Sequence, residues 1–160
     1  MSEIDAIRQL LGSKPRPVGW DERRARINEV GSVWPTASDI TLSAADLGGV
    51  ACEWSLAPGS SSAHVLMYFH GGGYCSGSIV SHRRLVTEAG RAAGVRTLAV
   101  EYRLAPEHPY PAARADAIAA WDALRAQGYA AERIVIGGDS AGGNLTMLLI
   151  HALRERGEHP

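Results

Sequence analysis

A serine flanked by small residues carries the strongest chemical signal in the sequence. Ser140 is the centre of a G-x-S-x-G pattern, Gly138 to Gly142, between a segment typical of a buried strand and one typical of a helix. A serine on such a tight strand-to-helix turn presents its hydroxyl at the carboxyl edge of a sheet. The positive end of the following helix stabilises negative charge that develops there. Taken alone, the pattern fits a nucleophile about as well as a simple reversal of the backbone.

A second glycine-rich segment favours acyl transfer. The residues HGGGY at 70–74 follow an apolar run that is typical of a buried strand. Three successive glycines let backbone N–H groups converge on one point, where they can stabilise an oxyanion. A flexible linker would explain the glycines but not their place after a buried strand. Together, the two segments indicate a serine hydrolase.

The elements that must position these segments alternate in type along the chain. Apolar runs and turn residues predict five strands, at residues 39–46, 50–57, 64–70, 95–102 and 133–138. Helical periodicity predicts five helices, at residues 2–12, 21–30, 81–93, 112–127 and 141–156. The last three strands alternate with the last three helices, which is typical of a parallel sheet covered by helices on both faces.

These elements predict the fold class α/β, with a mixed, largely parallel sheet of about five strands. Gly48 and Gly49 separate the first two strands, which form a predicted hairpin. We expect residues 1–37 to form the helices of a cap at the carboxyl edge of the sheet, and residues 38–160 to form the core.

Three motifs together resemble one known family. HGGGY (70–74), YRLAPEHPYPAA (102–113) and GDSAGGN (138–144) occur in the order and at the separations seen in the bacterial hormone-sensitive-lipase family of carboxylesterases. The similarity covers roughly residues 40 to 157. It implies an α/β-hydrolase fold and the hydrolysis of carboxylic esters, with short-chain esters or lactones as substrates. The segment GGDSAGGN matches neither a phosphate-binding P-loop nor a dinucleotide-binding fingerprint, so no cofactor is expected. The cysteines lack metal-ligand spacing, so no metal ion is expected either.

The resemblance also implies roles for single residues in the reaction. Ser140 would be the nucleophile, and the N–H groups of Gly71, Gly72 and Ala141 would form the oxyanion hole. His70 would order the glycine loop through hydrogen bonds and would not act as the catalytic base.

Other residues are expected to shape the surroundings of the serine. Tyr74 follows the glycine loop and is expected to line the substrate pocket. Trp20 and Trp34 either contribute to that pocket from the N-terminal helices or pack among those helices. By resemblance, Arg103 and Glu107 would form a structural ion pair beneath the site.

The catalytic base is the missing part. A serine hydroxyl is a weak nucleophile at neutral pH and needs an adjacent base, and in this superfamily the acid and the histidine follow the serine. His151 would lie about 16 Å from Ser140 along a helix, and His159 falls in a tail that ends in proline. We therefore expect the chain to be the N-terminal half of an esterase and to be inactive alone. Two alternatives stay open, a non-catalytic small-molecule binder and a half-protein that acts only with another chain.

Composition excludes several other classes. The 160 residues carry a net charge of −1, which argues against a general nucleic-acid binder. The cluster Arg23, Arg24 and Arg26 is interleaved with acids and predicts a solvated helix face. Two cysteines without ligand spacing predict free thiols, and Cys75 is expected to be a small buried one.

The chain shows no transmembrane or secretory pattern, so a cytoplasmic location is expected. The last predicted strand, Ile134 to Ile136, has no strand after it to cover its free side. An uncovered apolar edge is a template for association, so a homo-oligomer through this edge is a further expectation.

Overall fold

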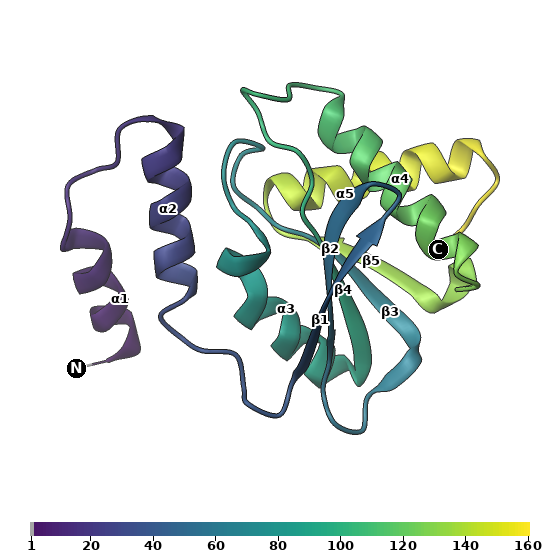
Figure 1. The fold of residues 1–160 in the computed structure, drawn as a ribbon, viewed down its shortest axis with the longest axis horizontal. Helices are drawn as coiled ribbons and strands as arrows, with labels where there is room; N and C mark the ends of the chain where they lie inside the picture. Colours follow the sequence, from purple (N-terminus) through teal and green to yellow (C-terminus); the bar gives the residue numbers. More distant parts are fainter. Residues whose placement is uncertain (1) are drawn as a thin grey trace.

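The computed structural model describes residues 2–160 and is built around a five-stranded sheet (Figure 1). The strand order is β1-β2-β4-β3-β5. The strands are β1 (Thr41–Leu47), β2 (Val50–Leu56), β3 (Ser61–Phe69), β4 (Val95–Val100) and β5 (Ile134–Gly138). β3 is parallel to both β4 and β5, whereas β2 is antiparallel to β1 and to β4. The predicted mixed, largely parallel sheet and its initial hairpin are therefore confirmed.

Residues 2–160 also form five α-helices and one short 3-10 helix, η1 (Ala131–Arg133), which precede, connect or follow these strands. The α-helices are α1 (Glu3–Gly12), α2 (Gly19–Gly31), α3 (Ile79–Ala93), α4 (Ala112–Ala126) and α5 (Ala141–Glu155). α3 begins two residues before its predicted start, because Ser78 is its N-cap. The Ser78 side chain accepts a hydrogen bond from the Ser81 N–H, and the Ser81 hydroxyl accepts one from the Ser78 N–H.

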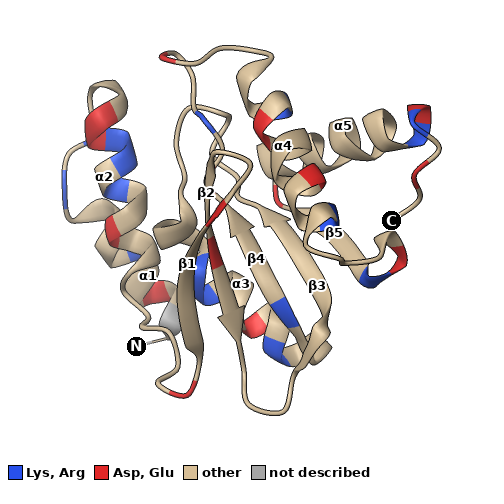
Figure 2. Ribbon diagram, turned by 45° about the vertical axis from the view of Figure 1, so that its right-hand side comes forward, with Lys and Arg blue, Asp and Glu red and all other residues tan. Residues whose placement is uncertain are grey.

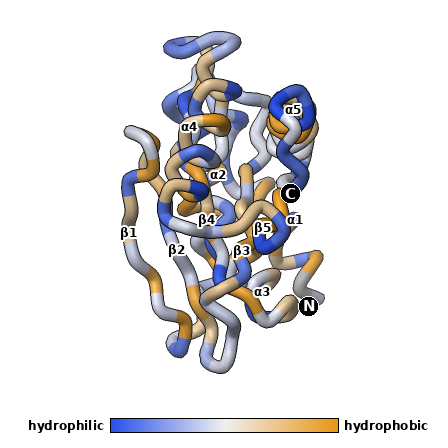
Figure 3. Tube along the Cα trace, turned by 90° about the vertical axis from the view of Figure 1, so that its right-hand side faces the viewer, coloured by the Kyte–Doolittle hydropathy of each residue, from blue (hydrophilic) through white to orange (hydrophobic). Residues whose placement is uncertain are grey.

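The two faces of the sheet differ in chemistry. One face carries side chains such as Trp54 and Leu98, which join the main apolar core with residues of α4 and α5. Figure 3 shows hydrophobic stretches in parts of the strands and in α5. The other face is more polar, since Glu53 pairs there with Arg83 of α3 at 2.7 Å. Successive side chains of a strand point to opposite faces of the sheet, so β2 contributes Trp54 to the apolar face and Glu53 to the polar face.

α2 lies beside α3, and α1 lies on the outer side of α2, at one side of the molecule (Figure 1). Figure 2 shows that α2 carries charges of both signs, and α2 buries no residue. The prediction of a solvated arginine face is wrong for Arg24 and Arg26, whose side chains are only 24% and 13% exposed. Arg26 donates to the Leu10 carbonyl at 2.6 Å and so ties α2 to α1. A polar contact thus connects α1 to α2.

β5 forms one edge of the sheet in the part of the chain that the structure describes. It pairs with β3 on one side, and Val135 is 66% exposed. Among residues 2–160, no helix combines the length and the apolar character that crossing a membrane requires.

Candidate active site

Ser140 occupies a strained position between β5 and α5. Its backbone has φ 51° and ψ −118°, and a non-glycine residue rarely adopts a positive φ. Such strain costs about 1–3 kcal/mol and persists only where the surrounding structure enforces it. The residue is exposed at the carboxyl end of β5 and directly before the first residue of α5. This is the strand-to-helix turn that the sequence predicts.

The glycines of the motif are needed because backbone segments meet closely at this turn. A Cβ atom on Gly142 would lie 1.9 Å from the carbonyl oxygen of Phe69, at the end of β3. A Cβ atom on Gly138 would lie 2.5 Å from the Gly142 carbonyl group. At Gly143 the nearest atom would be 3.3 Å away. The two glycines that flank the serine therefore let α5 start against the end of β3.

The glycine loop after β3 lies against this turn. The Gly71 N–H, predicted to bind an oxyanion, instead donates to Oδ1 of Asp139 at 2.9 Å. The N–H groups of Gly72, Gly73 and Ala141 donate to no acceptor within residues 2–160. The Gly73 N–H is therefore free as well as those of Gly72 and Ala141, whereas the Gly71 N–H is bound to Asp139.

Asp139 connects the serine turn to β3, to the glycine loop and to α3. This residue was not identified from the sequence. Besides the Gly71 N–H, its Oδ1 accepts from the Tyr68 hydroxyl at 3.1 Å and lies 3.3 Å from Nε2 of His82. Burial, followed by the Asp139 charge, raises the pKa of Tyr68, so this phenol keeps its proton and donates. The aspartate stands at the unspecified second position of G-x-S-x-G, where the pattern itself gives no signal.

His70 is a buried, neutral residue beneath the glycine loop. Its Nδ1 lies 2.9 Å from the Gly71 carbonyl oxygen, and because a carbonyl only accepts, Nδ1 carries the proton. The ring stacks on Tyr102 at 4.3 Å, and the Tyr102 hydroxyl donates to the His70 carbonyl oxygen at 2.7 Å. Burial lowers the pKa of His70 to about 4. These contacts support its predicted role in ordering the loop.

Tyr74 lines a cavity of about 180 Å³ along the first turns of α5, and Ser140 is not among the residues that line it. Its backbone also has a positive φ, 62°, and its hydroxyl donates to Oδ1 of Asn144 at 2.7 Å. Asn144, Leu145 and Leu148 supply the wall from α5, and the segment 103–114 supplies the opposite wall. Asn144 was missed by sequence reasoning, although it closes the GDSAGGN motif one helical turn after the nucleophile.

The two tryptophans lie elsewhere. Neither is among the residues that line the cavity beside Tyr74. Trp34 lines a separate hollow between the end of α2 and α3. Trp20 is 37% exposed, and the Arg23 guanidinium lies 5.2 Å from the centre of its ring.

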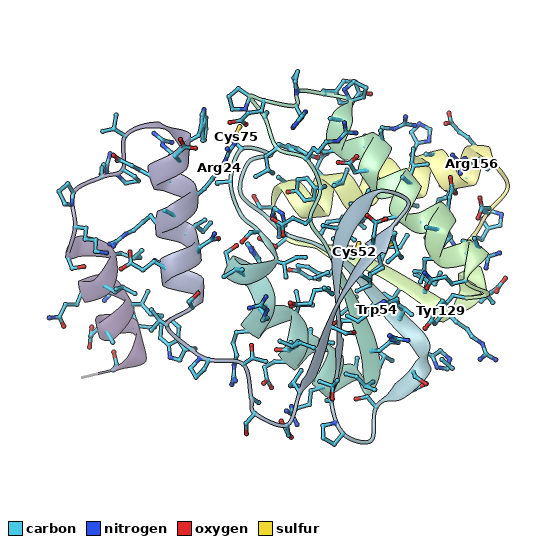
Figure 4. All side chains as sticks on the ribbon, viewed as in Figure 1. Arg24, Cys52, Trp54, Cys75, Tyr129 and Arg156 are labelled. Atoms are coloured by element: carbon cyan, nitrogen blue, oxygen red, sulfur yellow. The ribbon has the colours of Figure 1, made fainter. Side chains whose placement is uncertain are left out.

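The predicted Arg103–Glu107 ion pair is wrong. Arg103 pairs with Asp116 of α4 at 2.7 Å, and its backbone N–H binds the same carboxylate. Glu107 pairs with Arg24 of α2 at 2.7 Å, and this hydrogen bond lowers the pKa of Glu107 to about 2. Arg24 also reaches Cys75 (Figure 4). Arg103 and Glu107 therefore pair with residues of α4 and α2 and not with each other.

No base contacts the serine in the described part of the chain. Among residues 2–160, no histidine or carboxylate forms a hydrogen bond with the Ser140 hydroxyl. His151 is 74% exposed and lies 4.0 Å from Glu155 on the outside of α5. Across the same residues, no cluster of three histidine, cysteine or acidic side chains could hold a metal ion.

The cysteines form no disulfide. Cys52 is buried in the core, and burial raises the pKa of its thiol to about 12. Cys75, predicted to be buried, is only partly so.

Comparisons with known proteins agree with this geometry. A sequence profile of the family described as "alpha/beta hydrolase fold" matches residues 66–160. An acetyl-hydrolase from Streptomyces hygroscopicus is 38% identical over 164 aligned residues, which cover 97% of this chain and 52% of that protein. Esterase LipI from Mycobacterium tuberculosis is 35% identical, with 98% of this chain and 47% of that protein covered.

Solved structures show the same relation. A crystal structure of an esterase from the bacterial hormone-sensitive lipase family superposes with a TM-score of 0.90 at 38% identity, over 99% of this chain and 55% of that one. The chain spans about half the length of the relatives it matches. The chain belongs to the α/β-hydrolase fold family and, within it, to the bacterial hormone-sensitive-lipase esterases.

Proposed function

We propose that the protein hydrolyses carboxylic esters by acyl transfer to Ser140. The strained backbone of Ser140 carries this proposal, since an exposed serine with φ 51° between a strand and a helix has no evident packing purpose. Names of relatives such as acetyl-hydrolase and, from Pseudomonas putida, ethyl acetate hydrolase support short-chain esters as substrates. The two free thiols support a reducing, cytoplasmic location.

In this proposal, the free N–H groups next to Ser140 stabilise the tetrahedral intermediate. Attack of the serine oxygen on the ester carbonyl places negative charge on the carbonyl oxygen. Donors that already point at that position stabilise the charge without reorganisation. The N–H groups of Gly72, Gly73 and Ala141 have no acceptor among residues 2–160, which supports this role for them. The start of α5 adds the positive end of its dipole.

We further propose that the acid and the histidine of the triad are supplied by polypeptide outside residues 1–160. A base must come within roughly 2.6–3.2 Å of the serine oxygen, and no group of the described chain does so. Residues 1–160 alone should therefore show no detectable turnover. Oxyanion donors and binding would leave roughly 10³–10⁴-fold acceleration over water. A normal turnover number from these residues would refute this part of the proposal.

Hydrolysis of a short-chain aryl ester by a protein that contains this chain, the acid and the histidine tests the function. Ser140→Ala should lower kcat/KM by at least about 10⁴-fold, because loss of the nucleophile removes the whole covalent route. Ser43→Ala is the matched control, since Ser43 is an exposed serine on β1. Turnover of Ser140→Ala at the unaltered rate would overturn the assignment. Tight binding of an ester without hydrolysis would favour the alternative of a non-catalytic binder.

A further inference from the structure

Arg24 is a charged residue of α2 that contacts both loops beside the serine. Its Nε donates to the Cys75 carbonyl oxygen at 2.9 Å, next to the glycine loop. One Nη donates to the Ala105 carbonyl oxygen, also at 2.9 Å, in the loop after β4. Both Nη atoms bind the Glu107 carboxylate, at 3.0 and 2.7 Å. A single planar guanidinium therefore fixes the spacing of two loops, which a point charge would not do.

The same two loops meet at Tyr74, where the backbone is strained. The Ala105 N–H donates to the Tyr74 carbonyl oxygen at 2.8 Å. The next carbonyl, that of Cys75, is held by Arg24. A tyrosine with φ 62° keeps this conformation only when its surroundings enforce it. These two hydrogen bonds hold the backbone on the C-terminal side of the strained residue.

The side chain of Tyr74 connects this backbone to the cavity. It lines the cavity wall, and its hydroxyl binds Asn144 on α5. Ala105 lines the same cavity. A change in the two loops would therefore move one wall of the cavity relative to α5, the helix that begins directly after Ser140.

We propose that Arg24 is a positioning residue, which holds Tyr74 in its left-handed conformation and so sets the shape of the cavity that Tyr74 and Ala105 line. Its importance for catalysis rests on the proposed function, whereas its effect on the loop does not. Arg24 acts from a helix that buries no residue, so loss of its side chain should change the loops without opening the core.

Amide hydrogen exchange and the Cα and Cβ chemical shifts of Tyr74 test the proposal in a protein that contains this chain, the acid and the histidine. In Arg24→Gln, exchange of the Ala105 N–H should accelerate by at least about tenfold, the change expected when charge-assisted hydrogen bonds are lost. The Tyr74 shifts should leave the left-handed range. Amides of β4, such as that of Leu98, should keep their exchange rates. Arg23→Gln is the matched control, because the Arg23 side chain contacts the Trp20 ring and neither loop.

Arg24→Lys separates positioning from simple charge. Lysine keeps the charge near Glu107, but its three N–H donors lie on one nitrogen and cannot reproduce the four hydrogen bonds that the three guanidinium nitrogens make. Arg24→Lys should therefore not restore the slow exchange of the Ala105 N–H. Full restoration by lysine would overturn the proposal. Unchanged Tyr74 shifts in Arg24→Gln, equal acceleration across the sheet, or loss of the fold would overturn it too. Neither amide exchange nor the chemical shifts depend on ester hydrolysis. Both would therefore still test the role of Arg24 if the proposed function proved wrong.

Discussion

α5, which follows the serine, and α2, which contacts the loops after β3 and β4, are attached to the molecule by different forces. α5 begins at the nucleophile turn and buries seven residues against the sheet and α4: Ala141, Gly142, Leu145, Thr146, Leu149, Ala152 and Leu153. α2 buries none and is attached through ion pairs and hydrogen bonds. Burial of apolar surface is non-directional and strong, whereas exposed ion pairs contribute little to stability.

Because of this difference, α5 and α2 position different parts of the site. The α5 side fixes the position of Ser140 through the core, so this position can change only when the core does. The α2 side holds the loop wall through Arg24, and we expect substitution of this residue to leave the core folded. Stability and cavity shape should therefore respond to different substitutions.

The largest expected effect lies on the α5 side. Leu149 is fully buried in the core, and Leu149→Ala should lower the free energy of unfolding by about 2–5 kcal/mol, through lost burial and the cavity left behind. Urea denaturation measures this change. Met147→Ala, on the same helix at 64% exposure, should change it by less than about 0.5 kcal/mol. Equal effects of the two substitutions would mean that α5 is not anchored by its apolar side.

A pH effect of intermediate size comes from His70. Its pKa in the folded protein is lowered to about 4, from 6.5 for the free side chain. The unfolded chain therefore binds a proton that the folded protein does not, and the free energy of unfolding should fall as the pH drops from 6.5 to 4. The loss amounts to about 3 kcal/mol at most. In His70→Gln this part of the slope should vanish, and an identical slope would contradict the buried, neutral state.

The smallest effect is on the α2 side and appears at lower pH. The bond to Arg24 lowers the pKa of Glu107 from 4.5 to about 2, so this ion pair is complete above pH 4.5 and is lost as the pH falls through about 2. NMR titration of the Glu107 carboxyl group should give that low midpoint. In Arg24→Gln the midpoint should return toward 4.5. A midpoint near 4.5 in the unmodified chain would show that the pair does not form.

Local patterns predicted much of this molecule, and long-range pairing was the main failure. The turn around Ser140 follows from neighbouring glycines and the switch from strand to helix, so its signal lies within a few residues. The partner of Glu107 is Arg24, 83 positions earlier, and no local pattern connects the two. Arg103 and Glu107 are close in sequence, but their backbone directs them to different elements.

The oxyanion loop shows the same limit on a finer scale. Three glycines predicted free N–H groups, but the sequence could not decide which of them would be bound. The Gly71 N–H donates its hydrogen bond to Asp139, because the end of β3 and the end of β5 lie side by side in the sheet. That choice depends on strand order, which only the folded structure provides.

Covalent labelling of Ser140 tests the central claim most directly. A fluorophosphonate should add one group to a protein that contains this chain, the acid and the histidine, and peptide mapping by mass spectrometry should place the group on Ser140. Ser43→Ala should label normally, and Ser140→Ala should not label. Labelling on another residue, or undiminished labelling of Ser140→Ala, would contradict the claim that this strained serine is the nucleophile.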